Sequence, residues 1–204
     1  MIHIVDYGLG NVRAFNNVYK RLGFESVHAR TPDELHGAEK IILPGVGSFD
    51  HAMVLLQSSG MQPVLENLVQ VQQVPVLGVC VGMQILAIGS DEGVQRGLGW
   101  VDGHVRSLSS NPAAANLPTP HMGWNDVKAE PANPLFEGLV DDARFYFLHS
   151  YYFDCADRRQ STARADYGFT FDCAVQKENV FGVQFHPEKS HHWGVQLLKN
   201  YASL

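Results

Sequence analysis

The sequence predicts an α/β protein with a mostly parallel central sheet flanked by helices, and with antiparallel additions in the C-terminal half. Three observations lead to this prediction. Short apolar strand patterns alternate with amphipathic helix patterns through the first half of the chain. A nearly continuous apolar run at residues 74–79 is typical of a parallel strand buried on both faces. Beyond Trp100, segments rich in Val, Phe and Tyr recur at short spacing, as antiparallel strands do.

The length and composition favour a single domain. With 204 residues, 45% of them hydrophobic and 18% charged, the chain can bury a full core, and we expect residues 1–204 to form one domain. The net charge of −6 comes without a basic block, which argues against nucleic acid and anionic membranes as partners. No apolar run reaches the roughly 18 to 20 residues that span a bilayer, and the chain opens on a strand pattern rather than a signal peptide. We therefore expect a cytoplasmic protein whose partners are small molecules or other proteins.

The cysteines indicate a reducing environment. Cys80, Cys155 and Cys173 form an odd and sparse set with no paired spacing. Reduced thiols fit such a set better than a disulfide or zinc framework does. We expect Cys155 and Cys173 to take no part in the chemistry.

The chain opens with a βα unit. Residues 2–6 form a strand pattern, a glycine loop follows, and the next helical segment ends at Gly23, which suits a helix C-cap. Gly8 and Gly10 also allow a dinucleotide-binding loop. The third glycine of that motif is absent and no acidic residue clearly ends a second strand, so we set this alternative aside. The apolar face of the helix consists of Val12, Phe15, Tyr19 and Leu22.

The alternation of strands and helices continues toward residue 80. Strands are expected at residues 26–29 and 40–43. Between them, Thr31 can cap a helix that starts at Pro32, with Glu34 completing the capping box. This alternation is that of a parallel sheet covered on both faces. The next helical patterns are at residues 50–56 and 63–71.

The second half of the chain carries strand patterns that suggest antiparallel additions to the sheet. Residues 111–120, with three prolines and a run of alanines, are expected to form a surface loop. The expected strands are residues 101–108, 124–128, 144–148, 151–154, 173–177 and 180–185. A last helix from His192 has an apolar side made of Trp193, Leu197, Leu198 and Tyr201.

The segment around Cys80 carries the first chemical signal. Residues 75–84 read P-V-L-G-V-C-V-G-M-Q, an apolar strand and then a helical pattern from Met83. The flanking Gly78 and Gly82 permit the strained turn of a nucleophile elbow, which lifts Cys80 clear of the sheet. The N-terminal end of the following helix would then favour the thiolate. The alternative is an inert, buried cysteine.

The tetrapeptide F-H-P-E supplies a base and a carboxylate. Pro187 disfavours helical geometry at His186, and residues two apart in an extended chain face the same way, so His186 and Glu188 can cooperate. A thiol nucleophile needs a base, and the imidazole needs a carboxylate to orient it. One alternative is an ordinary surface turn. Another is a metal site that includes His191 and His192, but no thiolate ligand accompanies them and we expect no metal.

The loop P-G-V-G follows the strand at residues 40–43. In open parallel sheets, chemistry gathers beyond the carboxyl ends of neighbouring strands, which would bring this loop beside Cys80. Gly45 and Gly47 free the backbone to direct N–H groups inward, and a tetrahedral oxyanion requires such donors. Our candidates are the backbone N–H groups of Val46 and Val81. A plain β-turn is the alternative.

Together, G-V-C-V-G-M-Q, P-G-V-G and F-G-V-Q-F-H-P-E-K-S resemble the triad (class I) glutamine amidotransferases. Within that class, D-Y-G-L-G-N and the P-H-M-G-W-N of residues 120–125 resemble the glutaminase subunits of imidazole glycerol phosphate synthase. The family often has leucine where Val81 stands, a change that keeps the N–H donor. The resemblance implies glutamine hydrolysis through a γ-glutamyl thioester and no cofactor. The implied nucleophile, base and orienting carboxylate are Cys80, His186 and Glu188.

The resemblance also implies a partner. Ammonia would pass to a separate (β/α)8-barrel cyclase subunit, bound as a heterodimer, in histidine biosynthesis. The positions implied around glutamine are Gln84, Ser150 and Tyr151. Those implied toward the partner are Asn11, Trp124, Tyr146 and Lys189, which could also be a loop cap, two core aromatics and a solvated charge. We expect His121 and His149 to be packed or interface residues.

Two other functions stay open from the sequence. A paralogue could supply ammonia to a related partner in nucleotide-sugar or surface polysaccharide synthesis, and no residue separates that function from the first. A non-catalytic, redox-sensing α/β protein could keep a reactive Cys80, although the intact His186 and Glu188 argue against it. Labelling with a glutamine-analogue electrophile would separate this last alternative from a glutaminase.

Overall fold

The computed structural model describes residues 1–131, 133–139 and 143–204. Its main sheet has the strand order β2-β1-β3-β4-β13-β12-β10-β6-β5, with β11 and β8 continuing from β12. The first five strands of this order are mutually parallel, and β12 is antiparallel to β13. The parallel strands are β2 (Ser26–Ala29), β1 (Ile2–Val5), β3 (Lys40–Gly45), β4 (Val76–Cys80) and β13 (Val180–Val183).

The rest of the sheet is mostly antiparallel. Pairings β12 to β10, β10 to β6, β12 to β11 and β11 to β8 are antiparallel, whereas β5 is parallel to β6. The mixed α/β fold that the sequence predicts is therefore confirmed. These strands are β12 (Thr170–Lys177), β10 (Tyr151–Cys155), β6 (Gly103–Ser107), β5 (Gly89–Ser90), β11 (Ser161–Asp166) and β8 (Lys128–Ala129).

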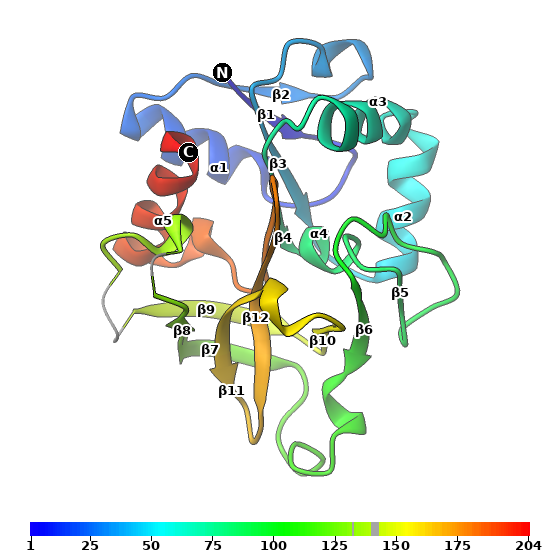
Figure 1. Cartoon of the computed structure of the whole chain (residues 1–204), viewed down its shortest axis with the longest axis vertical. Coiled ribbons are helices and arrows are strands. Elements are labelled where there is room, and N and C mark those ends of the chain that lie inside the picture. Colours follow the sequence, from blue (N-terminus) through cyan, green and yellow to red (C-terminus); the bar gives the residue numbers. More distant parts are fainter. Residues whose placement is uncertain (132, 140–142) are drawn as a thin grey trace.

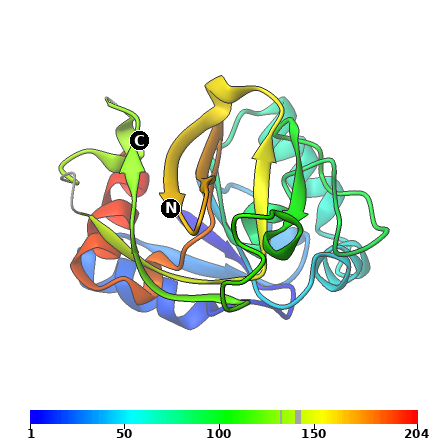
Figure 2. The ribbon, with the colours of Figure 1, turned by 90° about the horizontal axis from the view of Figure 1, so that it is seen from below.

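Helices cover both faces of the parallel strands (Figure 1). Helices α1 (Val12–Leu22) and α5 (His191–Ser203) lie on one side, and α2 (Phe49–Ser58) and α3 (Gln62–Glu66) lie on the other. Figure 2 shows the same division when the molecule is turned by 90°. Nearly all of the buried apolar side chains that the structure describes form one contiguous cluster from β1 to α5. Within the part of the chain that the structure describes, no helix is both long enough and apolar enough to cross a bilayer.

The N-terminal half follows the sequence predictions closely. Helix α1 ends at Gly23, whose φ of 79° is left-handed, as the C-cap prediction requires. The helix predicted from the capping box is only a 3-10 turn, Asp33–Leu35. The box is incomplete, because the Glu34 carboxylate accepts from the backbone N–H of Arg30 at 2.6 Å and not from that of Thr31. Thr31 Oγ1 still accepts from the Glu34 N–H at 3.4 Å. The helical pattern at residues 63–71 becomes α3 followed by a π-helical turn, Asn67–Val71.

Two pairing predictions for the C-terminal half are only partly right. The strand predicted at residues 180–185 is antiparallel to β12, as expected, but parallel to β4, because it lies between these two strands. Strands β7 (His121–Asp126) and β9 (Arg144–His149) pair with each other in a separate sheet instead of extending the main one. Strand patterns alone do not encode which neighbour a strand will pair with.

Two element predictions also need correction. The helix expected to begin at Met83 is instead a single turn, α4 (Val81–Gln84), which starts directly after Cys80. A helix this short adds little dipole at the thiol. Strand β11 has no counterpart in the prediction, since its sequence S-T-A-R-A-D is rich in small and polar residues.

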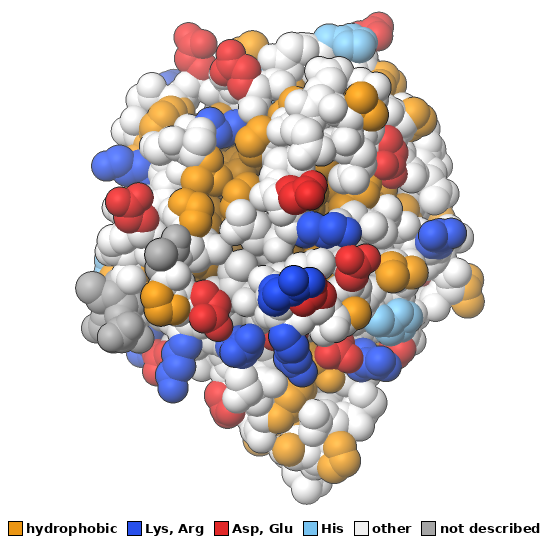
Figure 3. Space-filling model, in the orientation of Figure 1, with side chains coloured by type: hydrophobic (Ala, Val, Ile, Leu, Met, Phe, Trp, Pro, Cys, Tyr) orange, Lys and Arg blue, Asp and Glu red, His pale blue; other side chains and the backbone are white. Residues whose placement is uncertain are grey.

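Charged side chains are mixed on the face that Figure 3 shows, where Lys and Arg lie among Asp and Glu. Several exposed pairs form ion pairs, such as Arg106 with Asp154 at 2.7 Å and Arg144 with Asp126 at 2.9 Å. Interspersed charges of this kind keep a protein dispersed in water and produce no single strong field.

Candidate functional site

Cys80 occupies a strained turn at the end of β4. Its φ of 56° and ψ of −115° lie in a region that non-glycine residues rarely adopt. The turn is tight because α4 packs directly on β3, where a Cβ at Gly82 would lie 1.9 Å from the carbonyl oxygen of Leu43. Gly45 pairs with Cys80 in the β3–β4 register. The nucleophile-elbow geometry predicted from the sequence is therefore present.

His186 and Glu188 form a buried pair. His186 Nδ1 lies 2.9 Å from Glu188 Oε1, and the two side chains are 3% and 2% exposed. His186 is extended (φ −101°, ψ 92°), as predicted, but Glu188 lies in the 3-10 turn Pro187–Lys189. That turn, rather than the alternation of an extended strand, brings the carboxylate to the ring. The N–H of His186 donates to the carbonyl oxygen of Tyr146 at 2.9 Å, which fixes the backbone.

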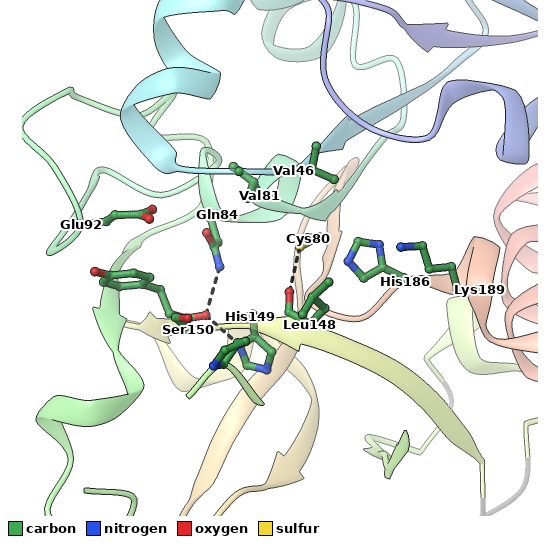
Figure 4. Close-up of a pocket in the computed structure, with 13 residues that line it drawn as sticks. Val46, Cys80, Val81, Gln84, Glu92, Leu148, His149, Ser150, His186 and Lys189 are labelled. Atoms are coloured by element: carbon green, nitrogen blue, oxygen red, sulfur yellow. Dashed lines mark hydrogen bonds between the residues drawn. The ribbon is translucent and has the colours of Figure 1, made fainter. Parts of the chain in front are cut away.

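The surroundings favour the protonated form of His186. Burial lowers the pKa of this imidazole, but the hydrogen bonds with Cys80 and then with Glu188 outweigh burial and raise the pKa to about 9. Because Nδ1 faces Glu188, Nε2 is the nitrogen available to the thiol. Figure 4 shows the His186 ring turned toward Cys80. The three side chains thus form a nucleophile, base and carboxylate arrangement.

A cavity of about 270 Å³, which we refer to as the Cys80 cavity, opens above this arrangement. Within it, Cys80 Sγ lies 3.8 Å from the carbonyl oxygen of Leu148. Figure 4 shows Cys80 with Val46 and Val81 on one side and Leu148 on the other. The cavity is lined by ten of the residues singled out from the sequence: Val46, Gly47, Cys80, Val81, Gln84, His149, Ser150, Tyr151, His186 and Lys189.

The P-G-V-G loop lies where the sequence predicts it. Val46 and Gly47 line the cavity, and Gly47 has a φ of 87°. Gly45 lies against α4 instead, since a Cβ there would come within 2.4 Å of the Gly82 nitrogen. Stabilisation of an oxyanion by the N–H groups of Val46 and Val81 stays a prediction.

Glu92 is a cavity residue that the sequence analysis missed. It lines the Cys80 cavity, and its Oε2 accepts from the N–H of Phe49 at 2.8 Å. In the sequence it stands in a D-E-G turn, which is indistinguishable from an ordinary solvated turn. The predicted glutamine contact Gln84 uses its amide nitrogen internally, donating to the carbonyl of Tyr151 and to Gln184 Oε1, both at 3.0 Å.

The four residues predicted to face a partner lie in different settings. Trp124 and Tyr146 are opposite each other on β7 and β9, and Trp124 is 41% exposed and stacks on His191 at 5.2 Å. Asn11 caps α1 by accepting from the Ala14 N–H, which is the plain alternative named for it. Lys189 lines the Cys80 cavity. Their part in an interface stays a prediction.

The two remaining cysteines are buried free thiols. Burial raises the pKa of Cys155 and that of Cys173 far above the ordinary thiol range. Both thiols therefore stay protonated and unreactive. Within residues 1–131, 133–139 and 143–204, no three His, Cys, Asp or Glu side chains gather as metal ligands.

Relatives of the chain carry one recurrent name. Imidazole glycerol phosphate synthase subunit HisH of Bdellovibrio bacteriovorus is 61% identical over 204 residues, 100% of both chains. The protein of that name from Leptospira interrogans is 52% identical, again over 100% of both chains. The HisH 2 protein of Pseudomonas aeruginosa is 42% identical over the same extent.

Solved structures agree in fold at low sequence identity. A crystal structure of a glutamine amidotransferase has a TM-score of 0.77 at 20% identity and covers 100% of this chain and 99% of its own. The structure of PurLQS from Thermotoga maritima has a TM-score of 0.74 at 18% identity, covering 99% of this chain and 97% of its own. The family model for glutamine amidotransferase class-I matches residues 3–202. The chain therefore belongs to the class-I glutamine amidotransferase family, in the branch whose members are named imidazole glycerol phosphate synthase subunit HisH.

Proposed function

We propose that this chain is the glutaminase subunit of an imidazole glycerol phosphate synthase, with Cys80, His186 and Glu188 as its catalytic residues. The observation that carries the proposal is the strained Cys80 elbow in the same cavity as His186, whose Nδ1 lies 2.9 Å from a buried carboxylate oxygen of Glu188. Full-length identity of 61% to a protein named HisH supports the choice of acceptor.

The reaction follows from the roles of these three groups. The Cys80 thiolate attacks the side-chain amide carbon of glutamine, and the tetrahedral oxyanion lies toward the N–H groups of Val46 and Val81. Imidazolium at His186 gives its proton to the departing ammonia, which leaves a γ-glutamyl thioester. The neutral imidazole then takes a proton from water, whose oxygen attacks the thioester carbon. Glutamate leaves, the proton returns to the Cys80–His186 pair, and one water is consumed for each ammonia released.

The ammonia product calls for a partner. Free ammonia in neutral water becomes mostly ammonium, which is not nucleophilic, so productive hydrolysis needs a sheltered acceptor. We infer that the acceptor is a (β/α)8-barrel cyclase subunit bound as a heterodimer, with Trp124, Tyr146, Lys189 and Asn11 toward it. The exposed Trp124 supports this, since aromatic residues are enriched in interfaces. Three free thiols support a cytoplasmic location.

Glu92 would bind the α-ammonium group of glutamine. Figure 4 shows Glu92 on the same side of the cavity as Gln84 and Ser150, away from His186. Glu92→Gln keeps an acceptor for Phe49 but removes the charge, so KM for glutamine should rise about tenfold to a hundredfold with kcat nearly unchanged. Steady-state kinetics of the variant would measure this. Asp91→Asn is the matched control, because Asp91 pairs with His104 outside the cavity. Equal KM values for the two variants would contradict the assignment.

The decisive experiment measures glutamine hydrolysis by the purified chain, alone and together with both a histidine-pathway cyclase and the nucleotide ligand of that cyclase. A large stimulation that depends on Cys80 is expected. Relatives named HisH 1 and HisH 2 suggest that some organisms have more than one such protein, which favours the polysaccharide or nucleotide-sugar paralogue as the second candidate. If the rate of glutamine hydrolysis is the same with and without the histidine-pathway partner, the result would favour the polysaccharide or nucleotide-sugar paralogue. No hydrolysis in either condition would contradict both.

A further inference from the structure

Two buried histidines lie at the Cys80 cavity and take no part in the reaction described above: His149 lines the cavity, and His121 lies behind His149. His121 begins β7 and His149 ends β9, and they face each other in the β7–β9 register with exposures of 4% and 6%. His121 Nδ1 lies 2.9 Å from His149 Nε2. The ring of His121 is stacked on Phe147 at 4.9 Å and on Tyr167 at 4.1 Å. Figure 4 shows His149 below Ser150 and Leu148.

The hydrogen bonds of this pair allow one arrangement of protons. His149 Nδ1 lies 2.8 Å from the carbonyl oxygen of Tyr151, which can only accept, so Nδ1 carries the proton. His149 Nε2 must then accept from the Nδ1–H of His121. His121 Nε2 in turn accepts from the side-chain amide of Asn125 at 3.3 Å. Both rings are thus neutral and donate through Nδ1.

The neutral state agrees with the surroundings of the two rings. Burial lowers the pKa of His121 to about 4. Burial, together with smaller effects of the nearby His121 and His186, lowers the pKa of His149 to about 3. The rings packed on His121 are aromatic, and the carbonyl contact of His149 is uncharged. At neutral pH the arrangement of hydrogen bonds therefore persists.

This chain of bonds ends on the backbone of the site. The Tyr151 carbonyl that His149 binds is also the acceptor of the Gln84 side chain at 3.0 Å. The carbonyl belongs to the segment of residues 148–151, where the Leu148 carbonyl faces Cys80 Sγ and Ser150 and Tyr151 line the cavity. Holding the Tyr151 carbonyl therefore holds one wall of the cavity.

We propose that His121 and His149 are positioning residues for glutamine, because their directed hydrogen bonds hold the segment of residues 148–151 against Cys80. The proposal rests on the proposed glutaminase function. Cys80 and His186 supply the reacting groups, so the effect of the pair acts on substrate binding, through the cavity wall that His149, Ser150 and Tyr151 form. Loosening of a binding wall should raise KM more than it lowers kcat.

Two substitutions at His121 separate positioning from packing. His121→Phe keeps the stack with Phe147 and Tyr167 but removes the donor to His149, so KM for glutamine should rise at least tenfold, with a melting temperature close to that of the parent chain. His121→Asn places an amide N–H near the position of Nδ1 but loses the stack. Its KM should stay within about threefold of the parent value although its melting temperature falls. His3→Asn is the control, since His3 is buried in β1 and its Nδ1 has no hydrogen-bond partner among the described residues.

The kinetics are measured on the complex with the cyclase, with the parent chain in the same series. If the parent hydrolyses glutamine and KM follows the melting temperature across the variants, the positioning role is overturned. If the parent does not hydrolyse glutamine, the proposed function fails, and a second measurement still decides the hydrogen-bond arrangement. Long-range nitrogen–proton NMR spectra of the parent chain at pH 7 should show both rings as neutral Nδ1–H tautomers. An Nε2–H tautomer or a charged ring at either residue would overturn the inference.

Discussion

Replacing Cys80 by alanine is expected to lower kcat/KM for glutamine hydrolysis by at least about a thousandfold. The substitution removes the sulfur that forms the thioester while keeping a small side chain in the strained turn. Without the nucleophile, water must attack an unactivated amide, assisted only by binding and the oxyanion donors. The measurement is glutamate release in the presence of the partner. A glutamine-analogue electrophile should alkylate Cys80 in the parent chain, and glutamine should protect against it.

The other two cysteines provide matched controls for this experiment. Cys155→Ala and Cys173→Ala also remove a buried thiol, but from strands β10 and β12. Because burial raises the pKa of both thiols, neither should react, and both variants should keep activity within about threefold. Residual activity of Cys80→Ala within tenfold of the parent chain would rule out the thioester route.

Glu188→Gln is expected to lower kcat by on the order of a thousandfold. The carboxylate holds His186 by Nδ1 at 2.9 Å and stabilises the imidazolium that passes its proton to ammonia. A neutral amide keeps the shape but can hold the wrong tautomer and cannot balance the charge. The pKa of His186, which is about 9 in the parent chain, should fall in the variant because one of the hydrogen bonds that raise it loses its charge. NMR titration of the histidine would measure this pKa.

The same pKa predicts how stability depends on pH. The folded-state pKa of His186 is raised from 6.5 to about 9, so its contribution to the free energy of unfolding is fully present below pH 6.5 and is lost as pH rises through 9. Urea unfolding between pH 6 and 10 should show a smaller loss of stability for Glu188→Gln than for the parent chain. Glu178→Gln, at an exposed turn, is the control. The role of Glu188 would be contradicted if the free energy of unfolding of Glu188→Gln and of the parent chain changed equally with pH. A kcat of Glu188→Gln within threefold of the parent value would also contradict it.

Much of the fold and the central chemistry could be predicted from local patterns. Alternating strand and helix periodicity predicted the βα order of the N-terminal half, since each pattern reports the buried face of one element. The glycines around Cys80 predicted the elbow, because close packing of α4 on β3 leaves no room for a side chain at Gly82. His186 and Glu188 were identified because their pairing depends on neighbours in the chain.

The parts that escaped prediction all depend on contacts between distant segments. Pairing of β13 with β4 and of β7 with β9 depends on how layers pack, and a strand pattern is the same for either neighbour. Glu92 is held at the cavity because its carboxylate accepts from the N–H of Phe49, the first residue of α2, which is 43 residues away in the sequence.

The sequence by itself determined the family motifs, the order of most elements and the three chemical groups, because these depend on short-range sterics and residue type. The tertiary structure decided which strands are neighbours, how the cavity is walled, and that His121 and His149 meet. The physical reason is that a hydrogen bond between residues 28 apart in sequence exists only once the sheet that carries them has formed.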